Sequence, residues 1–150
     1  MKTNRGFTLF ELLISLGILT VIFGATLYFL NPAKQLAVSR NDRREADLNT
    51  IINAIGQNAA DNRGVFTCLA GSPSASSTRM AMGADNYNIA PCLVPAYISR
   101  MPYDPVESGA HFVSVSDYDT VYAIARNPAT GRITVSAIYP ELDEIIAVTR

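Results

Sequence analysis

The sequence predicts an α+β protein in which a long N-terminal α-helix packs on a small antiparallel β-sheet. Three observations support this fold class. A run of 24 residues, Phe7 to Leu30, is apolar apart from one acid. A second helical pattern follows it, and the last part of the chain alternates in the way β-strands do. The chain has 150 residues, enough for one ordinary domain with an appendage.

The apolar run predicts a transmembrane helix over residues 7–30. As a helix it is about 36 Å long, enough to cross a hydrocarbon core of about 30 Å with some tilt. A removable secretory signal fits poorly, because such signals have a shorter apolar core of about 7–15 residues followed by a small-x-small cleavage site. Here the run is longer, and the residues after it, YFLNPAKQ, offer no such site.

Glu11 is the one charged residue in this run. An ionised carboxylate within a membrane span costs roughly 2.5–3.5 kcal/mol on insertion scales, so it needs water or a partner. In one interpretation Glu11 lies near the helix start and reaches the headgroups, where the helix dipole favours an acid. In the other a cation neutralises it. No lysine or arginine lies inside the run, but cleavage after Gly6 would create an α-amine on Phe7 of a neighbouring subunit.

Residues 31–63 predict an amphipathic second half of the helix. Pro32 should produce a kink near Leu30, because proline removes a backbone hydrogen bond and clashes with the previous turn. Apolar residues then recur at helical spacing and form a stripe that should pack on a sheet: Leu48, Ile51, Ile52, Ile55 and Ala59. The stretch before them, RNDRREAD, is expected to be solvated or to pair with adjacent subunits. Asn62-Arg63-Gly64 is a typical helix stop.

Residues 64–150 are expected to form a globular head. The stretch AGSPSASSTRMAMGADN predicts an exposed loop, and the prolines that follow it exclude regular helix over most of CLVPAYISRMPYDP. Strands are expected in HFVSVSD, TVYAIAR and RITVSAIYP, with NPATG as a hairpin turn and EIIAVTR as a further strand or edge. The predicted sheet therefore has three or four antiparallel strands.

The chemistry of the chain points away from catalysis. The net charge of −1 gives no sign of a nucleic-acid-binding surface. One histidine, His111, and two cysteines leave no cluster with metal-ligand spacing, and no phosphate loop or nucleophile elbow is present. Tyr118, Tyr122 and Tyr139 are expected to serve packing, and His111 to be incidental. We expect no catalytic residue and no enzymatic activity.

The stretch RGFTLFELLISLGIL closely resembles the N-terminal signature of type IV prepilins and type II secretion pseudopilins. That signature joins a short basic leader, a glycine, Phe-Thr-Leu-x-Glu-Leu and a hydrophobic helix. The resemblance implies the pilin fold and a leader peptide at residues 1–6. A prepilin peptidase would cut between Gly6 and Phe7 and N-methylate Phe7. Glu11 occupies the acidic position that the family uses in methylation and in docking of new subunits.

The resemblance also implies a function. The chain would be a structural subunit of a type IV pilus or a type II secretion pseudopilus. It would first sit in the cytoplasmic membrane as a single-pass protein, N-terminus in the cytoplasm and head outside. It would then polymerise with copies of itself and other pilins into an extracellular or periplasmic filament, driven by an assembly platform protein and an ATPase. The alternative is a membrane-tethered minor pilin that acts as a binding module for DNA, a surface or a secreted protein.

Two further expectations follow for the head. An anchored pilin head lies outside the cytoplasm, where disulfides persist, so we expect a bond between Cys68 and Cys92, with two buried free thiols as the alternative. In some pseudopilins the loop after a Pro-x-Asp-Pro motif, here residues 102–105, binds calcium. The oxygen ligands on offer are Asp104, Glu107, Asp117 and Asp119. Acids in a loop are usually just solvated, and no other metal or cofactor is expected.

Overall fold

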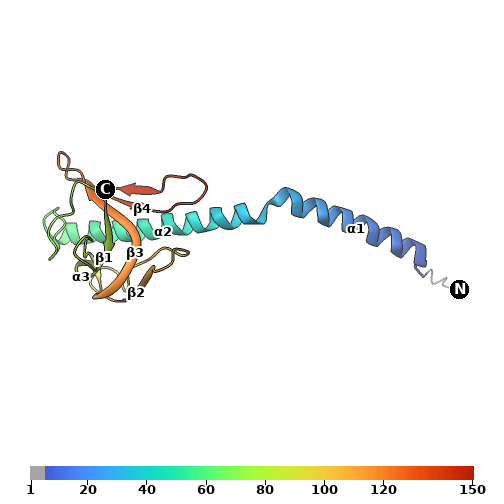
Figure 1. Cartoon of the computed structure of the whole chain (residues 1–150), viewed down its shortest axis with the longest axis horizontal. Coiled ribbons are helices and arrows are strands. Elements are labelled where there is room, and N and C mark those ends of the chain that lie inside the picture. The colour runs from blue at the N-terminus through green and yellow to red at the C-terminus, as the bar shows by residue number, and fades with distance from the viewer. Residues whose placement is uncertain (1–5) are drawn as a thin grey trace. The chain divides into compact units, whose positions relative to one another are not determined.

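The computed structural model describes residues 6–150 and has an α+β architecture, which confirms the predicted fold class (Figure 1). The chain divides into two compact units between Leu36 and Ala37. The first unit contains helix α1, Leu9–Leu30, and the start of helix α2, Pro32–Asp61. The second unit contains the rest of α2 and an antiparallel sheet.

Helix α1 begins because Thr8 caps it. The Thr8 hydroxyl accepts a hydrogen bond from the Glu11 backbone N–H at 3.2 Å, which satisfies one of the free donors of the first turn. Its 22 residues measure about 33 Å at the α-helical rise. By length and composition, Leu9–Phe29 is able to cross a membrane, and none of it is buried. The predicted helix is therefore present, two residues shorter at its start than the apolar run.

The helical conformation is interrupted between α1 and α2, where the sequence predicts a kink. α1 ends at Leu30, Asn31 adopts a left-handed conformation with φ of 39°, and α2 begins at Pro32. Asn31 accepts from the Lys34 backbone N–H through its carbonyl at 3.0 Å and through its side-chain oxygen at 3.3 Å. Proline is favoured at the first helical position, where its missing N–H is not needed. Pro32 thus starts a new helix and does not bend a continuous one.

The sheet has five antiparallel strands arranged around one long central strand. The order is β1-β3-β4-β5, and β2 pairs with the beginning of β3. A one-turn helix, α3, spans Ala90–Leu93. The strands are β1 Thr78–Ala81, β2 His111–Ser114, β3 Asp117–Arg126, β4 Ile133–Ala137 and β5 Ala147–Thr149.

One prediction about the head needs correction. Strand β1 lies inside the stretch predicted as an exposed loop, and it pairs with β3 while burying Met80 and Ala81. Its sequence, TRMA, lacks the β-branched run that marks a strand, so only pairing with β3 creates it.

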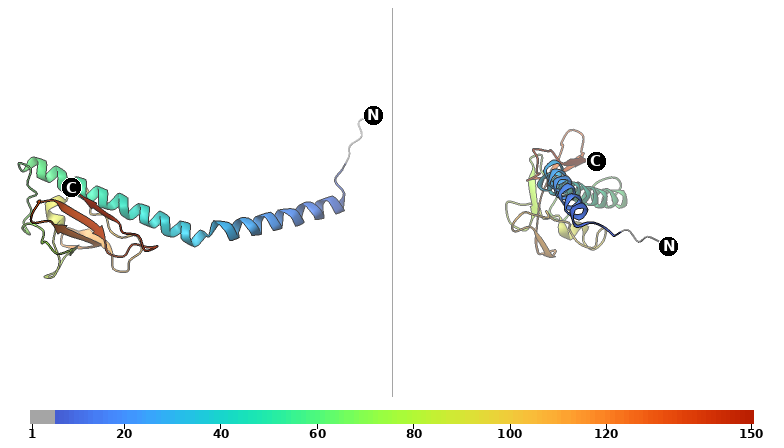
Figure 2. Two further views of the ribbon diagram at one scale, coloured as in Figure 1. Left: turned by 90° about the horizontal axis from the view of Figure 1, so that it is seen from above. Right: turned by 90° about the vertical axis from the view of Figure 1, so that its right-hand side faces the viewer.

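The core of the head lies between α2 and the sheet. Leu48, Ile51, Ile52 and Ile55 are at most 3% exposed, and Ala59 packs against the same cluster. The strands contribute the facing side chains, among them Tyr122, Ile124 and Val135. Figure 2 shows the strands gathered along one side of α2. The predicted helical stripe is therefore the surface on which the sheet packs, and α2 ends at Asp61, directly before the predicted stop.

Candidate functional site

The junction predicted for cleavage lies in extended chain just before α1. Gly6, Phe7 and Thr8 belong to no helix or strand, and all three are exposed. Phe7 is 81% exposed. A side chain built at Gly6 would meet nothing within 4 Å, and its φ is not in the left-handed range. The fold itself therefore places no demand for glycine at position 6.

Glu11 lies in the first turn of α1, among exposed apolar side chains. Its backbone N–H binds the Thr8 hydroxyl, and its carbonyl accepts from the Ser15 hydroxyl at 2.7 Å. No salt bridge joins its carboxylate to any group within residues 6–150. The structure thus places Glu11 in the first turn of α1, four residues after Phe7, with no salt bridge to its carboxylate among the described residues.

A second polar constellation, which sequence analysis missed, is buried in the head. Arg44 is 1% exposed and donates to both carboxylate oxygens of Asp104, at 2.6 and 3.2 Å. It also donates to Glu141 at 3.0 Å, and Arg40 donates to the same carboxylate at 2.6 and 2.7 Å. Asn41 accepts from Arg44 and completes what we call the Arg44 network. This network ties α2 to the segment before β2 and to the loop before β5.

The sequence did hold a signal for Arg44. Asn41, Arg44 and Leu48 continue the helical stripe of α2 at the same spacing, so Arg44 falls on the face that packs on the sheet. The stretch RNDRREAD was expected to be solvated or to pair with other subunits, and Asn41 and Arg44 show this to be wrong for two of its residues. The error arose because the stretch is highly charged, and an arginine is almost never fully buried unless it is paired.

Burial and hydrogen bonding compete in the Arg44 network. Burial favours the neutral form of Asp104, but hydrogen bonds from Arg44 and from the backbone N–H groups of Val106 and Glu107 outweigh it and lower the pKa of Asp104. Hydrogen bonds from Arg40 and Arg44 lower the pKa of Glu141 to about 2. Both carboxylates are therefore held ionised at neutral pH.

Asp47 behaves in the opposite way. It is partly buried, and burial raises the pKa of its carboxyl, although a hydrogen bond from the Tyr122 hydroxyl at 2.9 Å acts against that rise. Burial is also the main cause that raises the pKa of Tyr122. Asp47 therefore bonds to Tyr122 of strand β3. A pair with Arg43, four residues earlier on α2, would have been the local alternative.

Acidification is expected to destabilise the head between about pH 5 and pH 2. Asp104 and Glu141 have folded pKa values below their ordinary values of 3.8 and 4.5, so their stabilisation is complete above those values and is lost as the pH falls. The raised pKa of Asp47 has the opposite sign and offsets part of this loss. Urea unfolding of the full chain in detergent, followed by the near-ultraviolet signal of its tyrosines, measures the effect. Asp47→Asn should make the loss steeper, and an unfolding midpoint that stays constant down to pH 2 would contradict this account.

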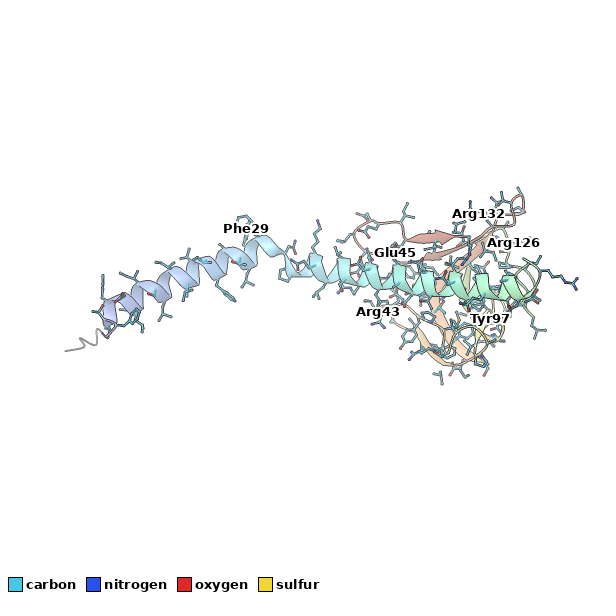
Figure 3. All side chains as sticks on the ribbon, turned by 180° about the vertical axis from the view of Figure 1, so that it is seen from behind. Phe29, Arg43, Glu45, Tyr97, Arg126 and Arg132 are labelled. Carbon is cyan, nitrogen blue, oxygen red and sulfur yellow. A yellow bond between two sulfur atoms is a disulfide. The ribbon has the colours of Figure 1, made fainter. Side chains whose placement is uncertain are left out.

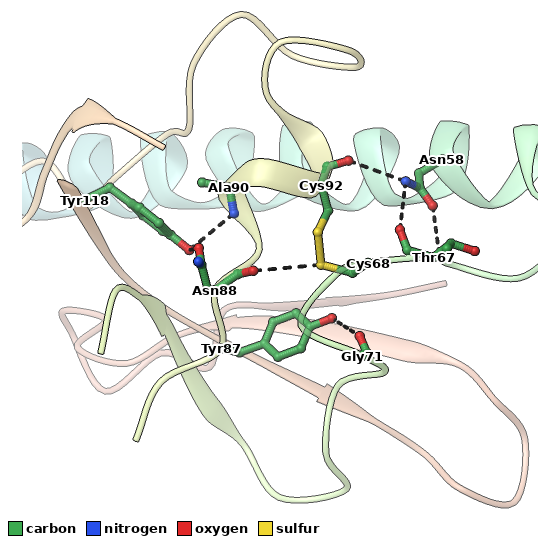
Figure 4. The surroundings of a disulfide bond; sticks show 9 residues. All are labelled: Asn58, Thr67, Cys68, Gly71, Tyr87, Asn88, Ala90, Cys92 and Tyr118. Carbon is green, nitrogen blue, oxygen red and sulfur yellow. Dashed lines mark hydrogen bonds between the residues drawn. A yellow bond between two sulfur atoms is a disulfide. The ribbon is translucent and has the colours of Figure 1, made fainter. Parts of the chain in front are cut away.

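Cys68 and Cys92 form a disulfide, with their Cα atoms 5.2 Å apart (Figure 4). The buried Asn58 of α2 supports both sides of the bond. Its side-chain amide donates to the carbonyls of Thr67 and Cys92, at 3.1 and 3.4 Å, and its oxygen accepts from the Thr67 N–H at 2.9 Å. The disulfide therefore fixes the chain after α2 to helix α3.

Removal of the disulfide by Cys68→Ser with Cys92→Ser is expected to lower the free energy of unfolding by about 3–3.5 kcal/mol, from the size of the closed loop. Denaturant unfolding of the full chain in detergent checks this. Reductant should destabilise the unmodified chain to a similar extent and leave the double variant unchanged. A variant as stable as the unmodified chain would show that the loop is ordered without the bond.

The four carboxylates proposed for calcium do not come together. Asp104 binds Arg44, Asp119 accepts from Arg79 at 2.7 Å, and Asp117 lies 3.1 Å from His111. In the part of the chain that the structure describes, residues 6–150, no group of three His, Cys, Asp or Glu residues is placed to hold a metal. The calcium prediction stays untested. Tyr118 and Tyr122 are buried in the core, while Tyr139 is half exposed.

Comparison with known families identifies a motif in the N-terminal segment. Residues 1–27 match the prokaryotic N-terminal methylation motif, the type IV prepilin signature. This motif marks a prepilin-type structural protein family and not an enzyme, and it supports a type IV pilin-like precursor. Together with the apolar α1, it fits a membrane-anchored pilin. No curated protein and no solved structure matches the chain.

Proposed function

We propose that the chain is the structural subunit of a type IV pilus or type II secretion pseudopilus. It is cleaved after Gly6, N-methylated at Phe7, and polymerised through its apolar helix. One observation carries the proposal: an apolar helix that begins at Leu9, with every side chain from Leu9 to Phe29 exposed and Glu11 as its single charge, follows the exposed Gly6-Phe7 junction. A simple anchor requires the apolar helix but neither of the other two features.

The conformation of the junction supports cleavage at this point. Proteases act on exposed chain that is free of secondary structure, and the Gly6-Phe7 bond meets both conditions. Because the fold leaves open space around Gly6, the glycine is best explained by an enzyme that must approach the backbone closely. Cleavage removes Lys2 and Arg5, which leaves 10 basic against 13 acidic side chains.

Glu11 supports polymerisation over simple anchoring. Cleavage exposes an α-amine on Phe7, four residues before Glu11. In a bundle of such helices, the amine of one subunit neutralises the Glu11 of its neighbour in a low-dielectric setting. An axial slip would leave both charges unpaired, so the pair fixes the register between subunits. The apolar face that lipid covers in the monomer is then covered by other helices in the filament.

The proposal includes partners and a location that follow from the family resemblance. A prepilin peptidase cuts the leader on the cytoplasmic side, and the head lies outside the cytoplasmic membrane. A platform protein and an ATPase then extract the helix into the growing filament. The disulfide between Cys68 and Cys92 agrees with a head outside the cytoplasm, because such bonds are rare in reducing compartments.

Expression of the full chain in a host that carries a type IV pilus assembly machinery tests the proposal. We expect the chain, without residues 1–6, in filaments that are sheared from the cells and visible by negative-stain microscopy. The Gly6→Val variant should remain uncut in the membrane fraction. A cut chain that never leaves the membrane would contradict the filament function and favour a tethered binding module.

A further inference from the structure

Four arginines gather at the end of the head where α2 stops, and we call them the arginine surface: Arg63, Arg126, Arg132 and Arg150. Two adjoining clefts place Arg126 and Arg150, and Arg63 and Arg132 are placed by their neighbours in the chain. Both clefts are lined by Gly64, Phe66, Gly131 and Ile133; Arg126 lines one and Arg150 the other. Gly64 and Gly131 are the chain neighbours of Arg63 and Arg132. Figure 3 shows Arg126 and Arg132 near the C-terminal end of α2.

No carboxylate side chain neutralises the arginine surface. Arg126 donates to the Gly131 carbonyl at 3.4 Å and Arg150 to the Asn53 side chain at 3.2 Å, and within residues 6–150 none of the four forms a salt bridge. The nearest helical acid, Asp61, interacts with Tyr97. Even with Asp61 counted, the four arginines leave the surface with net positive charge. Such a concentration of like charge is costly unless a partner neutralises it.

Val65 lines the cleft that holds Arg126, and Leu69 lies four residues further along the chain. Val65 is 59% exposed and Leu69 is 96% exposed. The disulfide at Cys68 and the Asn58 hydrogen bonds to Thr67 hold the chain between them. Apolar residues on a fixed surface, rimmed by charge, are typical of a protein–protein contact.

A loop elsewhere on the same head has the complementary character. This acidic loop, residues 141–145, presents Leu142 at 42% and Ile145 at 94% exposure. Arg40 and Arg44 neutralise Glu141, but Asp143 and Glu144 have no cationic partner within residues 6–150. The acidic loop therefore offers two carboxylates without a cationic partner among the described residues, beside two exposed apolar side chains.

The acidic loop is rigid because Asn41 holds it. The Asn41 amide donates to the Glu141 carbonyl at 2.7 Å and to the Glu144 carboxylate at 2.9 Å, while its oxygen accepts from the Glu141 N–H at 3.0 Å. Asn41 is only 3% exposed. A loop that is already fixed loses little entropy when a partner binds it.

The two surfaces cannot contact each other within one chain. The acidic loop is attached to α2 at position 41, whereas the arginine surface is attached at positions 53 to 63. The helical rise puts those positions about 18 to 33 Å apart. A complement for either surface can therefore come only from another molecule.

We infer that the arginine surface of one subunit binds the acidic loop of the next copy of this chain. Such a contact joins two different patches, and a heterologous contact that does not close generates an open helical filament. This inference rests on the proposed filament function and adds to it the head surfaces through which neighbouring subunits recognise each other. The apolar pairs, Val65 with Leu69 and Leu142 with Ile145, form the centre of the contact, and the charges set its polarity.

Charge reversal on both sides tests the contact in the pilus-assembling host. Arg63→Glu with Arg132→Glu should reduce sheared filaments at least about tenfold, because each contact along the filament then opposes like charges. Asp143→Arg with Glu144→Arg should have the same effect, and the four changes together should restore filaments. Arg100→Glu is the control, because Arg100 is exposed, stacks over Tyr103 at 5.5 Å and lies outside both surfaces.

The outcomes separate this contact from the function on which it rests. If the unmodified chain forms no filament, the proposed function itself fails, and the contact fails with it. If it does, and the charge-reversed variants are cut normally and form filaments at the unmodified level, only the contact is overturned. If those variant filaments also lose the ability to retain duplex DNA that the unmodified filaments have, the arginine surface binds a polyanion instead. Failure of the fourfold variant to restore filaments would also overturn the pairing.

Chemical cross-linking gives a second readout that does not depend on filament yield. Val65→Cys combined with Ile145→Cys places one thiol at each surface. A short bis-maleimide should then convert sheared filaments into a ladder of covalent multimers. Val113→Cys with Ile145→Cys is the matched control, because Val113 is 71% exposed on β2, outside both surfaces. Equal ladders from both pairs, or none from the first, would contradict the contact.

Discussion

Glu11→Ala is expected to abolish filament assembly, by about 100-fold or more, while membrane insertion stays intact. Removal of the acid leaves the Phe7 amine of the neighbouring subunit unpaired in a low-dielectric bundle, at a cost of roughly 2.5–3.5 kcal/mol on insertion scales. The variant helix is more apolar than the original, so insertion should not suffer. Filaments in the shear fraction and chain in the membrane fraction measure the two effects.

Matched variants separate charge from shape at this position. Glu11→Asp keeps the charge and should retain part of the assembly, whereas Glu11→Gln keeps the size and should lose it. If all three variants assemble normally, Glu11 only reaches the headgroups, and the pairing account is wrong.

Arg44→Leu is expected to lower the free energy of unfolding of the head by about 3–5 kcal/mol, because removal of one partner from a buried ion pair leaves the other charge unpaired. Asp104 has no exposed side-chain surface through which water could replace the arginine. A domain of ordinary stability has only about 5–15 kcal/mol to lose. Denaturant unfolding of the full chain in detergent measures the change.

Two comparisons identify the cause of this loss. Arg44→Leu with Asp104→Asn removes both charges but keeps an acceptor for the Val106 and Glu107 N–H groups, so it should recover part of the stability. Arg40→Met, at a position about one-third exposed, should have a much smaller effect. A loss that the double variant does not reduce would point to packing and not to charge.

The apolar helix, the helical stripe and the central strands could be predicted from the sequence because their signals are local. The apolar run from Phe7 to Leu30 needs no tertiary contact to be recognised, and the family match to residues 1–27 covers most of it. The stripe from Leu48 to Ile55 likewise follows from helical spacing alone. The strands around Val121 and Ile133 alternate strongly enough to be found, whatever they pair with.

The missed features depend on partners far away in the chain. Strand β1 exists because Thr78 and Arg79 pair with β3, about 45 positions later. Arg44 is buried because Asp104 and Glu141, 60 and 97 positions away, supply its partners. Single-sequence patterns describe neighbours along the chain, so a long-range ion pair gives no more than the hint that Arg44 lies on the core face.

The most direct test of the central claim is the intact mass of the full chain after co-expression with a prepilin peptidase, beside a Gly6→Val control. The account predicts loss of residues 1–6 and a gain of one methyl group on Phe7, both absent from the control. A chain of full mass, produced while the peptidase cuts another prepilin in the same cells, would contradict the account. The apolar helix would then be only the anchor of a membrane-tethered head.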